Sequence, residues 1–260
     1  MEQWVRFEYL GGEKFGVLRN DHVAIYEGDM FEDPTPTGGF LPLQDIRVLI
    51  PTKPTKLIGL WNNFYTRAEQ EGWAKPKHPL YFLKANGSLL ANGGQIQQPA
   101  SYAGPVVFEG ELGIVIGKAC REVTEEQAER YIFGYTCVND VTARGLMGED
   151  PSFVQWTRAK SFDTFGVIGP VIATGLEATT LVVKTLVDGV EMQNYPVNDM
   201  FFLPHQIVSR LSHDMTLHPG DVIACGTSLG AGPMTPGCTV EVRIDGIGSL
   251  INPFKTRSVD

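Results

Sequence analysis

Residues Val106–Ile116 read Val-Val-Phe-Glu-Gly-Glu-Leu-Gly-Ile-Val-Ile, and this stretch decides what kind of fold the chain forms. Apart from two glycines and two glutamates it is apolar on both faces, which is typical of a strand buried on both sides. Side chains alternate along a strand, so Glu109 and Glu111 are expected to point the same way, roughly 7 Å apart along the chain. We therefore predict one central strand that carries two carboxylates on one face.

These two carboxylates need a positive partner. An ionised carboxylate is rarely buried alone, because its removal from water costs several kcal/mol. Salt bridges to Lys or Arg, or a position at an exposed strand edge, would satisfy Glu109 and Glu111. A hard divalent cation would satisfy them as well, because it prefers oxygen ligands. The stretch alone leaves these interpretations open.

The composition is that of a globular protein. The chain has 260 residues, of which 43% are hydrophobic and 20% are charged, so it is long enough to bury a sizeable core. Its net charge of −9 and its lack of any basic cluster disfavour binding to a nucleic-acid backbone. A few local Lys and Arg residues would still suffice to bind a small anionic substrate.

Cysteine spacing and hydropathy indicate in which cellular compartment the protein is expected. The four cysteines are widely spaced and form no CxxC or Cys/His pattern, so we expect free thiols in a reducing environment. The first residues show no basic-then-apolar signal pattern, and no stretch approaches ~18 consecutive apolar residues. We therefore expect a cytoplasmic protein without a membrane partner.

The chain divides near residue 50. Residues 1–50 alternate short apolar runs with turn signals and predict a small β-rich N-terminal subdomain, in which 28–39 is expected to be a loop. Residues 51–260 then form the predicted catalytic domain. The strands expected before this boundary are Val5–Leu10, Phe15–Leu18, His22–Tyr26 and Arg47–Ile50.

Strands dominate the predicted catalytic domain as well. Polar segments with helical spacing predict short helices at 66–72, after the capping box at Thr124, and at 205–213. There is no regular alternation of strands and helices, so we expect a mainly β (α+β) fold with short helices, a mixed β-roll or sandwich. The further strands expected are 57–60, 80–83, 135–139, 165–168, 171–173, 181–187 and 222–224, with 240–244 as the last.

Polar signals stand at the ends of several of these apolar segments, and together they resemble the fumarylacetoacetate hydrolase family. The resemblance extends from about residue 56 to 254, and it points to the branch that includes 2-hydroxyhepta-2,4-diene-1,7-dioate isomerase, acylpyruvase and oxaloacetate decarboxylase-like members. The motifs that carry it are Glu109-Gly-Glu111, Gly134-Tyr-Thr-Cys-Val-Asn-Asp140 with Arg144, Lys160-Ser-Phe-Asp163-Thr-Phe165, Gly169-Pro170, and His218-Pro-Gly-Asp221-Val-Ile-Ala-Cys-Gly-Thr227.

The resemblance implies a metal site. In the family, Mg²⁺, Mn²⁺ or sometimes Ca²⁺ is held at the positions that match Glu109, Glu111 and Asp140. Three carboxylates around one point would repel each other by roughly 4 kcal/mol per pair at ~4 Å and an effective dielectric constant near 20. A divalent cation reverses this repulsion and keeps coordination positions open for water and substrate.

The resemblance also implies a set of residues that contact the substrate. Lys160 and Arg144 match positions that face the substrate, where they would stabilise the charge of an enolate or carboxylate oxygen. Thr227 matches a threonine that contacts the substrate carboxylate, and Tyr65 fits a substrate-contacting tyrosine. Lys84 lies on the strand that borders the same pocket. Family members are commonly homodimers, so we expect a homodimer here.

One part of the family pattern is missing. Family hydrolases place a His–Glu pair in the segment after the strand at 57–60, where it deprotonates the attacking water. Here the place of the histidine falls on Arg67 or Gln70, and neither side chain acts as a general base near neutral pH. Glu69, Glu71 and His78 are the remaining candidates for a catalytic base.

We therefore expect a Mg²⁺-dependent enzyme that cleaves a carbon–carbon bond of a small anionic 2-oxo or 2,4-dioxo acid through an enolate held by the metal, in the breakdown of aromatic compounds. The missing histidine makes hydrolysis less favoured than decarboxylation, because only hydrolysis needs an activated water. One alternative is an isomerase or tautomerase of a 2-hydroxymuconate-like dienoate. A second is a metal-binding homologue without catalytic activity.

Overall fold

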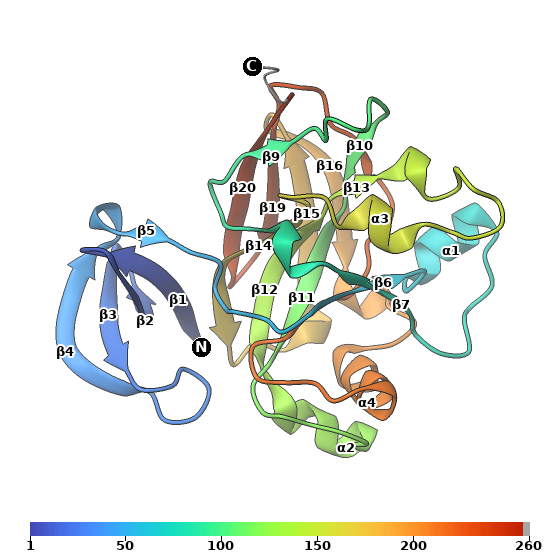
Figure 1. The fold of residues 1–260 in the computed structure, drawn as a ribbon. Helices are drawn as coiled ribbons and strands as arrows, with labels where there is room; N and C mark the ends of the chain where they lie inside the picture. The colour runs from blue at the N-terminus through green and yellow to red at the C-terminus, as the bar shows by residue number, and fades with distance from the viewer. Residues whose placement is uncertain (257–260) are drawn as a thin grey trace.

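The computed structural model describes residues 1–256, so 257–260, the last residues of the predicted catalytic domain, lie outside the described residues (Figure 1). Strands form most of the regular secondary structure of the described chain and helices are few and short, so the predicted mainly β fold is confirmed. The α-helices are α1 (Tyr65–Glu71), α2 (Glu125–Ala128), α3 (Trp156–Lys160) and α4 (Pro204–Asp214). Short 3₁₀ helices lie at Leu43–Asp45, Asn86–Ser88, Glu129–Tyr131, Arg144–Leu146, Ala178–Thr180 and Val197–Asp199.

A large twelve-stranded sheet runs through the molecule, and its N-terminal strands stand to one side (Figure 1). Its main order is β4-β3-β2-β1-β14-β12-β11-β17-β6-β7, with β5 paired to β1 and β8 paired to β14. Its strands are β1 (Glu2–Tyr9), β2 (Gly12–Arg19), β3 (His22–Glu27), β4 (Thr35–Pro42), β5 (Arg47–Val48), β6 (Leu57–Trp61), β7 (Leu80–Lys84), β8 (Leu89–Leu90), β11 (Gly110–Ile116), β12 (Ile132–Asp140), β14 (Gly166–Thr174) and β17 (Val222–Ala224).

Two smaller sheets complete the fold. A three-stranded sheet has the order β13-β10-β18, and a five-stranded sheet has the order β16-β15-β19-β20-β9. Their strands are β9 (Ile96–Gln97), β10 (Val106–Phe108), β13 (Thr142–Ala143), β15 (Val182–Val187), β16 (Val190–Pro196), β18 (Gly232–Pro233), β19 (Thr239–Ile244) and β20 (Gly248–Lys255). The three sheets are joined by the chain itself, because β10 leads directly towards β11.

The N-terminal strands are part of the same hydrogen-bonded sheet as the rest of the chain. Strand β1 pairs with β14 in antiparallel register, with Glu2 opposite Thr174 and Trp4 opposite Ile172. On its other edge β1 pairs with β2, which leads on to β3 and β4. The predicted domain boundary near residue 50 stays a prediction. Strands from both sides of that boundary belong to one sheet.

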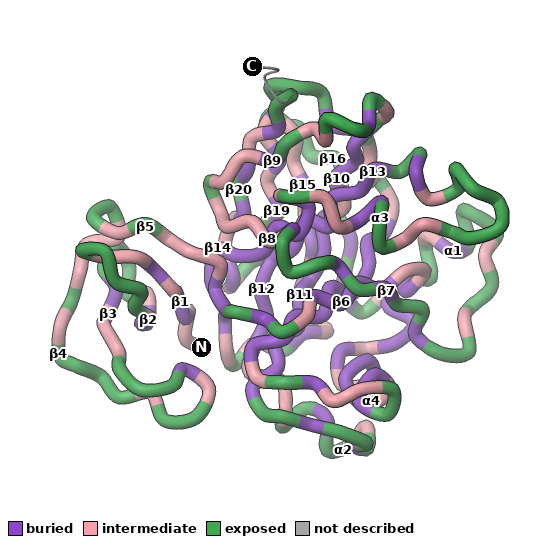
Figure 2. The backbone as a smooth tube through the Cα atoms, viewed as in Figure 1, coloured by how far each residue is buried: buried purple, intermediate pink, exposed green. Residues whose placement is uncertain are grey.

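Strand β11 is the buried central strand that the apolar run predicts, and every one of its residues is buried (Figure 2). The prediction of a single strand over 106–116 is wrong, because the run forms two strands, β10 and β11, that belong to different sheets. The change of sheet falls at Glu109. There the backbone N–H donates to the side-chain oxygen of Asn139 in β12, at 3.0 Å, instead of to a backbone carbonyl.

Other differences from the predicted strands have local causes. The predicted loop at 28–39 contains the start of β4, an edge strand, where glycine and proline are tolerated. Strands predicted at 165–168 and 171–173 form one strand, β14, whose register against β12 shifts between Tyr135 and Cys137. Strands β16 and β20 were not predicted because each turns a polar residue inward, Gln193 and Asn252 respectively.

Three of the four α-helices, α1, α2 and α4, lie where the sequence predicts helices, and α3 was not predicted. Helix α1 ends at Gly72, which takes up the left-handed conformation that glycine favours. The capping box at Thr124 opens α2, as predicted. All four cysteines are buried and unpaired. Within residues 1–256 there is no helix long and apolar enough to span a membrane.

Candidate functional site

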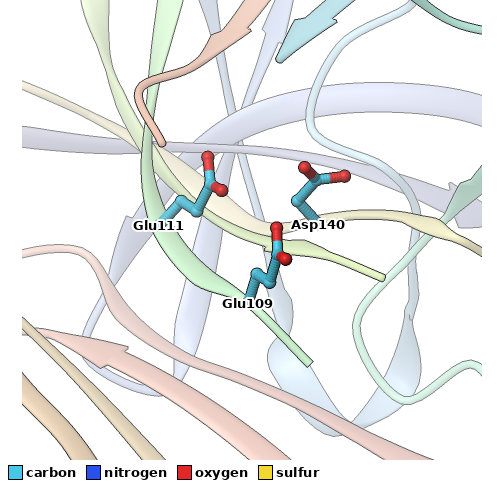
Figure 3. A group of neighbouring side chains, drawn as sticks. All are labelled: Glu109, Glu111 and Asp140. Carbon is cyan, nitrogen blue, oxygen red and sulfur yellow. The ribbon is translucent and has the colours of Figure 1, made fainter. Parts of the chain in front are cut away.

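The three predicted metal ligands meet at one point (Figure 3). Glu109 lies at the junction of β10 and β11, Glu111 lies in β11, and Asp140 ends β12. One oxygen from each carboxylate lies within 4.8 Å of the other two. A backbone hydrogen bond fixes this arrangement, because the N–H of Asp140 donates to the carbonyl of Glu109 at 2.8 Å. We call these three residues the carboxylate triad.

Two lysines approach the triad. Lys160, at the end of α3, places its ammonium 2.6 Å from Glu109 Oε2 and also donates to Asp140 Oδ2. Lys84, at the end of β7, donates to Asp140 Oδ1 and, at 3.1 Å, to the carbonyl of Val141. With all five groups ionised, the three carboxylates and two ammonium groups have a net charge of −1.

The excess charge falls on Glu111. Neither lysine forms an ion pair with it among the described residues. Its Oε2 accepts a hydrogen bond from the N–H of Gly226 at 2.8 Å, while its Oε1 is buried with no hydrogen-bond partner in the described chain. Burial, together with the charges of Asp140 and Glu109, raises the pKa of Glu111 well above its usual value.

For Asp140 and Lys160, nearby opposite charges outweigh the effect of burial on the pKa. Burial by itself would raise the pKa of Asp140, but the charges of Lys160 and Lys84 outweigh it and lower the pKa. Burial would likewise lower the pKa of Lys160, but Asp140, Glu109 and Glu111 outweigh it and raise the pKa. Lys160 is therefore held as an ammonium ion beside the triad.

The triad fits a hard divalent cation. All the ligand atoms are carboxylate oxygens, which Mg²⁺, Mn²⁺ and Ca²⁺ accept. The buried Oε1 of Glu111 is an oxygen for which residues 1–256 supply no donor. A cation here would satisfy it and would offset the uncompensated negative charge.

A cavity of ≈ 320 Å³ opens beside the triad. Its polar lining is formed by four residues that the sequence predicts at the site, together with two others, Asn62 and Arg67, and the rest of the lining is mainly aromatic. The polar side chains are Glu109, Arg144, Lys160, Thr227, Asn62 and Arg67, and the aromatic ones are Trp61, Trp73, Phe82 and Trp156. Leu60, Met147, Gly148 and Val154 complete the lining.

The predicted substrate-contacting residues divide into two groups. Thr227 and Arg144 line the cavity, as does Lys160. Lys84 does not line it; this lysine is 2% exposed and donates to Asp140. Tyr65 is 48% exposed, packs against Phe201 and does not line the cavity either.

The candidate bases lie outside the cavity. Glu69, Glu71 and His78 are all exposed, and none of them lines the cavity. Arg67, from the same helix as the two glutamates, does line it and donates to the carbonyl of Thr227 at 3.3 Å. The resemblance implies a general base from this segment in family hydrolases. In this chain the residue of α1 that lines the cavity is instead the positively charged Arg67.

Several residues of the site were not predicted. Gln193 reaches from β16 to the triad region: its oxygen accepts from the N–H of Gly110 at 3.0 Å, and its nitrogen donates to Thr227 Oγ1 at 2.8 Å. The hydroxyl of Tyr195, two residues further on, donates to the carbonyl of Gly110. The alternation of polar Gln193 with aromatic Tyr195 is a weak signal, because many surface strands have the same pattern.

The fold and the site define a β-rich protein with a candidate divalent-metal centre beside a partly cationic cavity. The family model described as fumarylacetoacetate (FAA) hydrolase, C-terminal, matches residues 56–255, and a second model described as Rv2993c-like, N-terminal, matches residues 2–51. The chain belongs to the fumarylacetoacetate hydrolase family, as the motifs predict.

Known relatives span almost the whole chain. Protein Rv2993c of Mycobacterium tuberculosis is 42% identical over 226 residues, which make up 86% of this chain and 84% of that protein. The structure of 2-hydroxyhepta-2,4-diene-1,7-dioate isomerase from Mycobacterium marinum is 35% identical, with a TM-score of 0.90 and coverage of 99% of this chain and 100% of that one.

A more distant solved relative contains a metal. Maleylpyruvate hydrolase from Sphingobium sp. SYK-6, in complex with manganese(II) ion and pyruvate, is 25% identical, with a TM-score of 0.81 and coverage of 98% of this chain and 99% of that one. These relatives are an isomerase and a hydrolase, so the chain belongs to a family of enzymes and is similar to the isomerase branch that the motifs predict.

The triad can be tested by metal titration. A ligand that binds the folded protein raises its melting temperature, so we expect Mg²⁺ or Mn²⁺ to stabilise the wild-type protein. Glu111→Gln removes the carboxylate that carries the excess charge and should weaken metal binding at least about tenfold. Differential scanning calorimetry across metal concentrations measures this effect. Glu191→Gln, an exposed change on β16, is the control and should respond like the wild type.

Lys84 can be tested through stability. Lys84→Met removes one of the two cations bonded to Asp140, and loss of one partner of a buried ion pair typically costs about 3–5 kcal/mol. Urea unfolding should show a loss of this order in chelator and a smaller loss in saturating Mn²⁺, because the metal compensates the triad. Equal losses in both conditions would contradict the pairing. Lys118→Met, at an exposed lysine, should change little in either.

Proposed function

We propose that this protein is a Mg²⁺-dependent enzyme that cleaves a carbon–carbon bond of a small anionic 2-oxo or 2,4-dioxo acid. One observation carries the proposal: the Lys160 ammonium touches two members of the triad and also lines the cavity. A reacting oxygen in the cavity would therefore lie next to a fixed positive charge. Mn²⁺ is the alternative metal, and the manganese and pyruvate of the Sphingobium hydrolase support the pairing of a divalent cation with a 2-oxo acid.

The cavity is suited to an anion although the whole chain has a net charge of −9. Lys160, Arg67 and Arg144 all line it. Neither arginine forms an ion pair with a carboxylate of residues 1–256. Their charges are thus available to attract and orient a substrate carboxylate.

The chemistry follows from which charges develop during the reaction. A divalent cation at the triad supplies a Lewis acid for the 2-oxo-carboxylate group. When a bond to the carbon next to the 2-oxo group breaks, negative charge moves to the 2-oxo oxygen. Lys160 stabilises this charge as a buried ammonium, and the guanidinium of Arg144 holds the carboxylate. Neither residue has to lose its proton.

The missing base favours one kind of cleavage. Decarboxylation needs no activated water, whereas hydrolysis does. Glu69, Glu71 and His78 are exposed and do not line the cavity, which supports a reaction that needs no base from this segment. Decarboxylation is accordingly the form of cleavage that we favour.

Isomerisation is the second candidate function. It is supported by the similarity to the Mycobacterium marinum isomerase, which covers 99% of this chain. Shifting a double bond along a dienoate needs the same stabilised enolate but breaks no carbon–carbon bond. A metal-binding protein without activity is less well supported, because a cation site alone gives no role to Lys160 and Arg144 in the cavity wall.

The proposal is tested with oxaloacetate, 2,4-dioxopentanoate and a 2-hydroxymuconate-like dienoate, in Mg²⁺, in Mn²⁺ and in chelator. Release of CO₂, formation of acetate with pyruvate, and a change in enol absorbance without loss of carbon separate decarboxylation, hydrolysis and isomerisation. Lys160→Met should lower kcat by about 10²–10³, the usual effect of removing one oxyanion donor, and should retain metal binding. Full turnover in chelator, or no turnover of any acid, would contradict the proposal.

The absence of a base in this segment gives a separate prediction. Glu69→Gln, Glu71→Gln and His78→Gln should each leave kcat nearly unchanged, because the three side chains are exposed. A general base contributes about 10²–10⁴-fold, so a drop of that size in steady-state assays of any one variant would identify it as the base. Gln70→Glu, which adds a carboxylate on the same helix, tests whether a new charge there alters turnover by itself.

A further inference from the structure

Part of the cavity lining is a continuous series of aromatic rings. Phe82 stacks on Trp156 with ring centres 5.6 Å apart and an interplanar angle of 12°. Trp156 contacts Trp61 at 5.7 Å, and Trp61 contacts Trp73 at 4.8 Å. These spacings are those of interacting aromatic pairs. We call Trp61, Trp73, Phe82 and Trp156 the aromatic wall.

This wall contains three of the four tryptophans of the chain. Trp61, Phe82 and Trp156 belong to neither of the two hydrophobic cores of the described residues. The three tryptophans are half-buried, and each lines the cavity. Aromatic surface left uncovered by the core and turned to a cavity is typical of a ligand site.

The backbone is arranged to admit the ring of Phe82. Gly59 in β6 lies directly opposite Phe82 in β7. A Cβ atom at position 59 would lie 2.4 Å from the ring of Phe82. Glycine here therefore lets the ring lie across β6, where it meets both Trp156 and the ammonium of Lys160, which is 4.9 Å from the ring centre.

The aromatic wall has polar groups at both ends. At one end Phe82 contacts Lys160. At the other end Trp73 lies under the guanidinium of Arg67, at 5.6 Å from the ring centre, and Arg67 donates to the carbonyl of Thr227. Both ends are connected to the triad region, because Lys160 pairs with Glu109 and the hydroxyl of Thr227 donates to the carbonyl of Gly110. The wall itself offers no charge to a substrate tail.

We propose that the aromatic wall makes this enzyme selective for 2-oxo acids whose tail carries a flat aromatic ring. This inference rests on the proposed function, which places the 2-oxo acid head at the triad and Lys160. A ring in the cavity would stack on, or meet edge to face, the indoles of Trp61 and Trp156. The carboxylate that decarboxylation removes would lie with the acid head beside Lys160 and Arg144. A carboxylate further along the tail would instead lose water against the indoles of Trp61 and Trp156 without gaining a partner.

The test measures binding to the metal-loaded full-length protein with three acids that share a head and differ in the tail. The acids are 2-oxo-4-phenylbutanoate, 2-oxobutanoate and 2-oxoglutarate, and isothermal titration calorimetry in saturating Mn²⁺ gives each Kd. We expect the phenyl acid to bind at least about tenfold more tightly than either other acid, from stacking and burial of the ring.

Two variants show whether the wall causes the preference. Trp61→Leu and Trp156→Leu each remove one indole and should weaken binding of the phenyl acid about tenfold while changing the Kd of 2-oxobutanoate less than about twofold. Phe40→Leu changes an aromatic residue that is 62% exposed on β4 and should alter none of the three constants. Thermal melting confirms that each variant is folded.

The outcomes separate this inference from the proposed function. If all three acids bind with similar Kd values, or if the carboxylate-tailed acid binds best, the selectivity is absent while the 2-oxo acid site stands. If the phenyl acid binds best but neither tryptophan variant reduces its affinity, the wall is not the cause and the inference is wrong. If no acid binds in a metal-dependent way, the proposed function fails and this inference fails with it.

Discussion

The mutual repulsion of three carboxylates in one place is the constraint on which the rest of the site depends. The backbone hydrogen bond from Asp140 to Glu109 brings these residues together, and the register of β11 against β12 places Glu111 beside them. Each negative charge then needs a compensating positive charge. Lys84 and Lys160 form ion pairs with Asp140 and Glu109, whereas Glu111 forms no ion pair among the described residues. The metal proposal begins from that imbalance.

Much of this centre could be predicted from the sequence. Two glutamates in an apolar run are unusual enough to indicate a cation, and Asp140 at a strand end completes the family motif. The family and the mainly β fold were also predictable. What escaped prediction depends on contacts between distant segments. The change of sheet at Glu109 follows from a hydrogen bond to the side chain of Asn139, and no local pattern reports such a bond.

The roles of single side chains were harder to predict than their presence. Lys84 was expected in the pocket because its strand borders it, yet Phe82, two residues earlier on the same face, lines the cavity while Lys84 lies against Asp140. The aromatic wall comes from four separate segments of the chain, and none of them has a motif. The available signal was indirect: all four tryptophans, including the three of the aromatic wall, lie outside the strands that the apolar runs predict.

Gly59 shows how such a site can change during evolution. It touches neither the triad nor, by any side chain, a substrate, and yet the space that it leaves decides where the ring of Phe82 lies. A glycine codon becomes an alanine codon by one base change, and the added methyl group would displace that ring. Under the proposed role of the aromatic wall, such a change would alter which acids the protein binds, while the triad and Lys160 would be unchanged. In this fold the repertoire of substrates is open to selection through a residue that has no side chain.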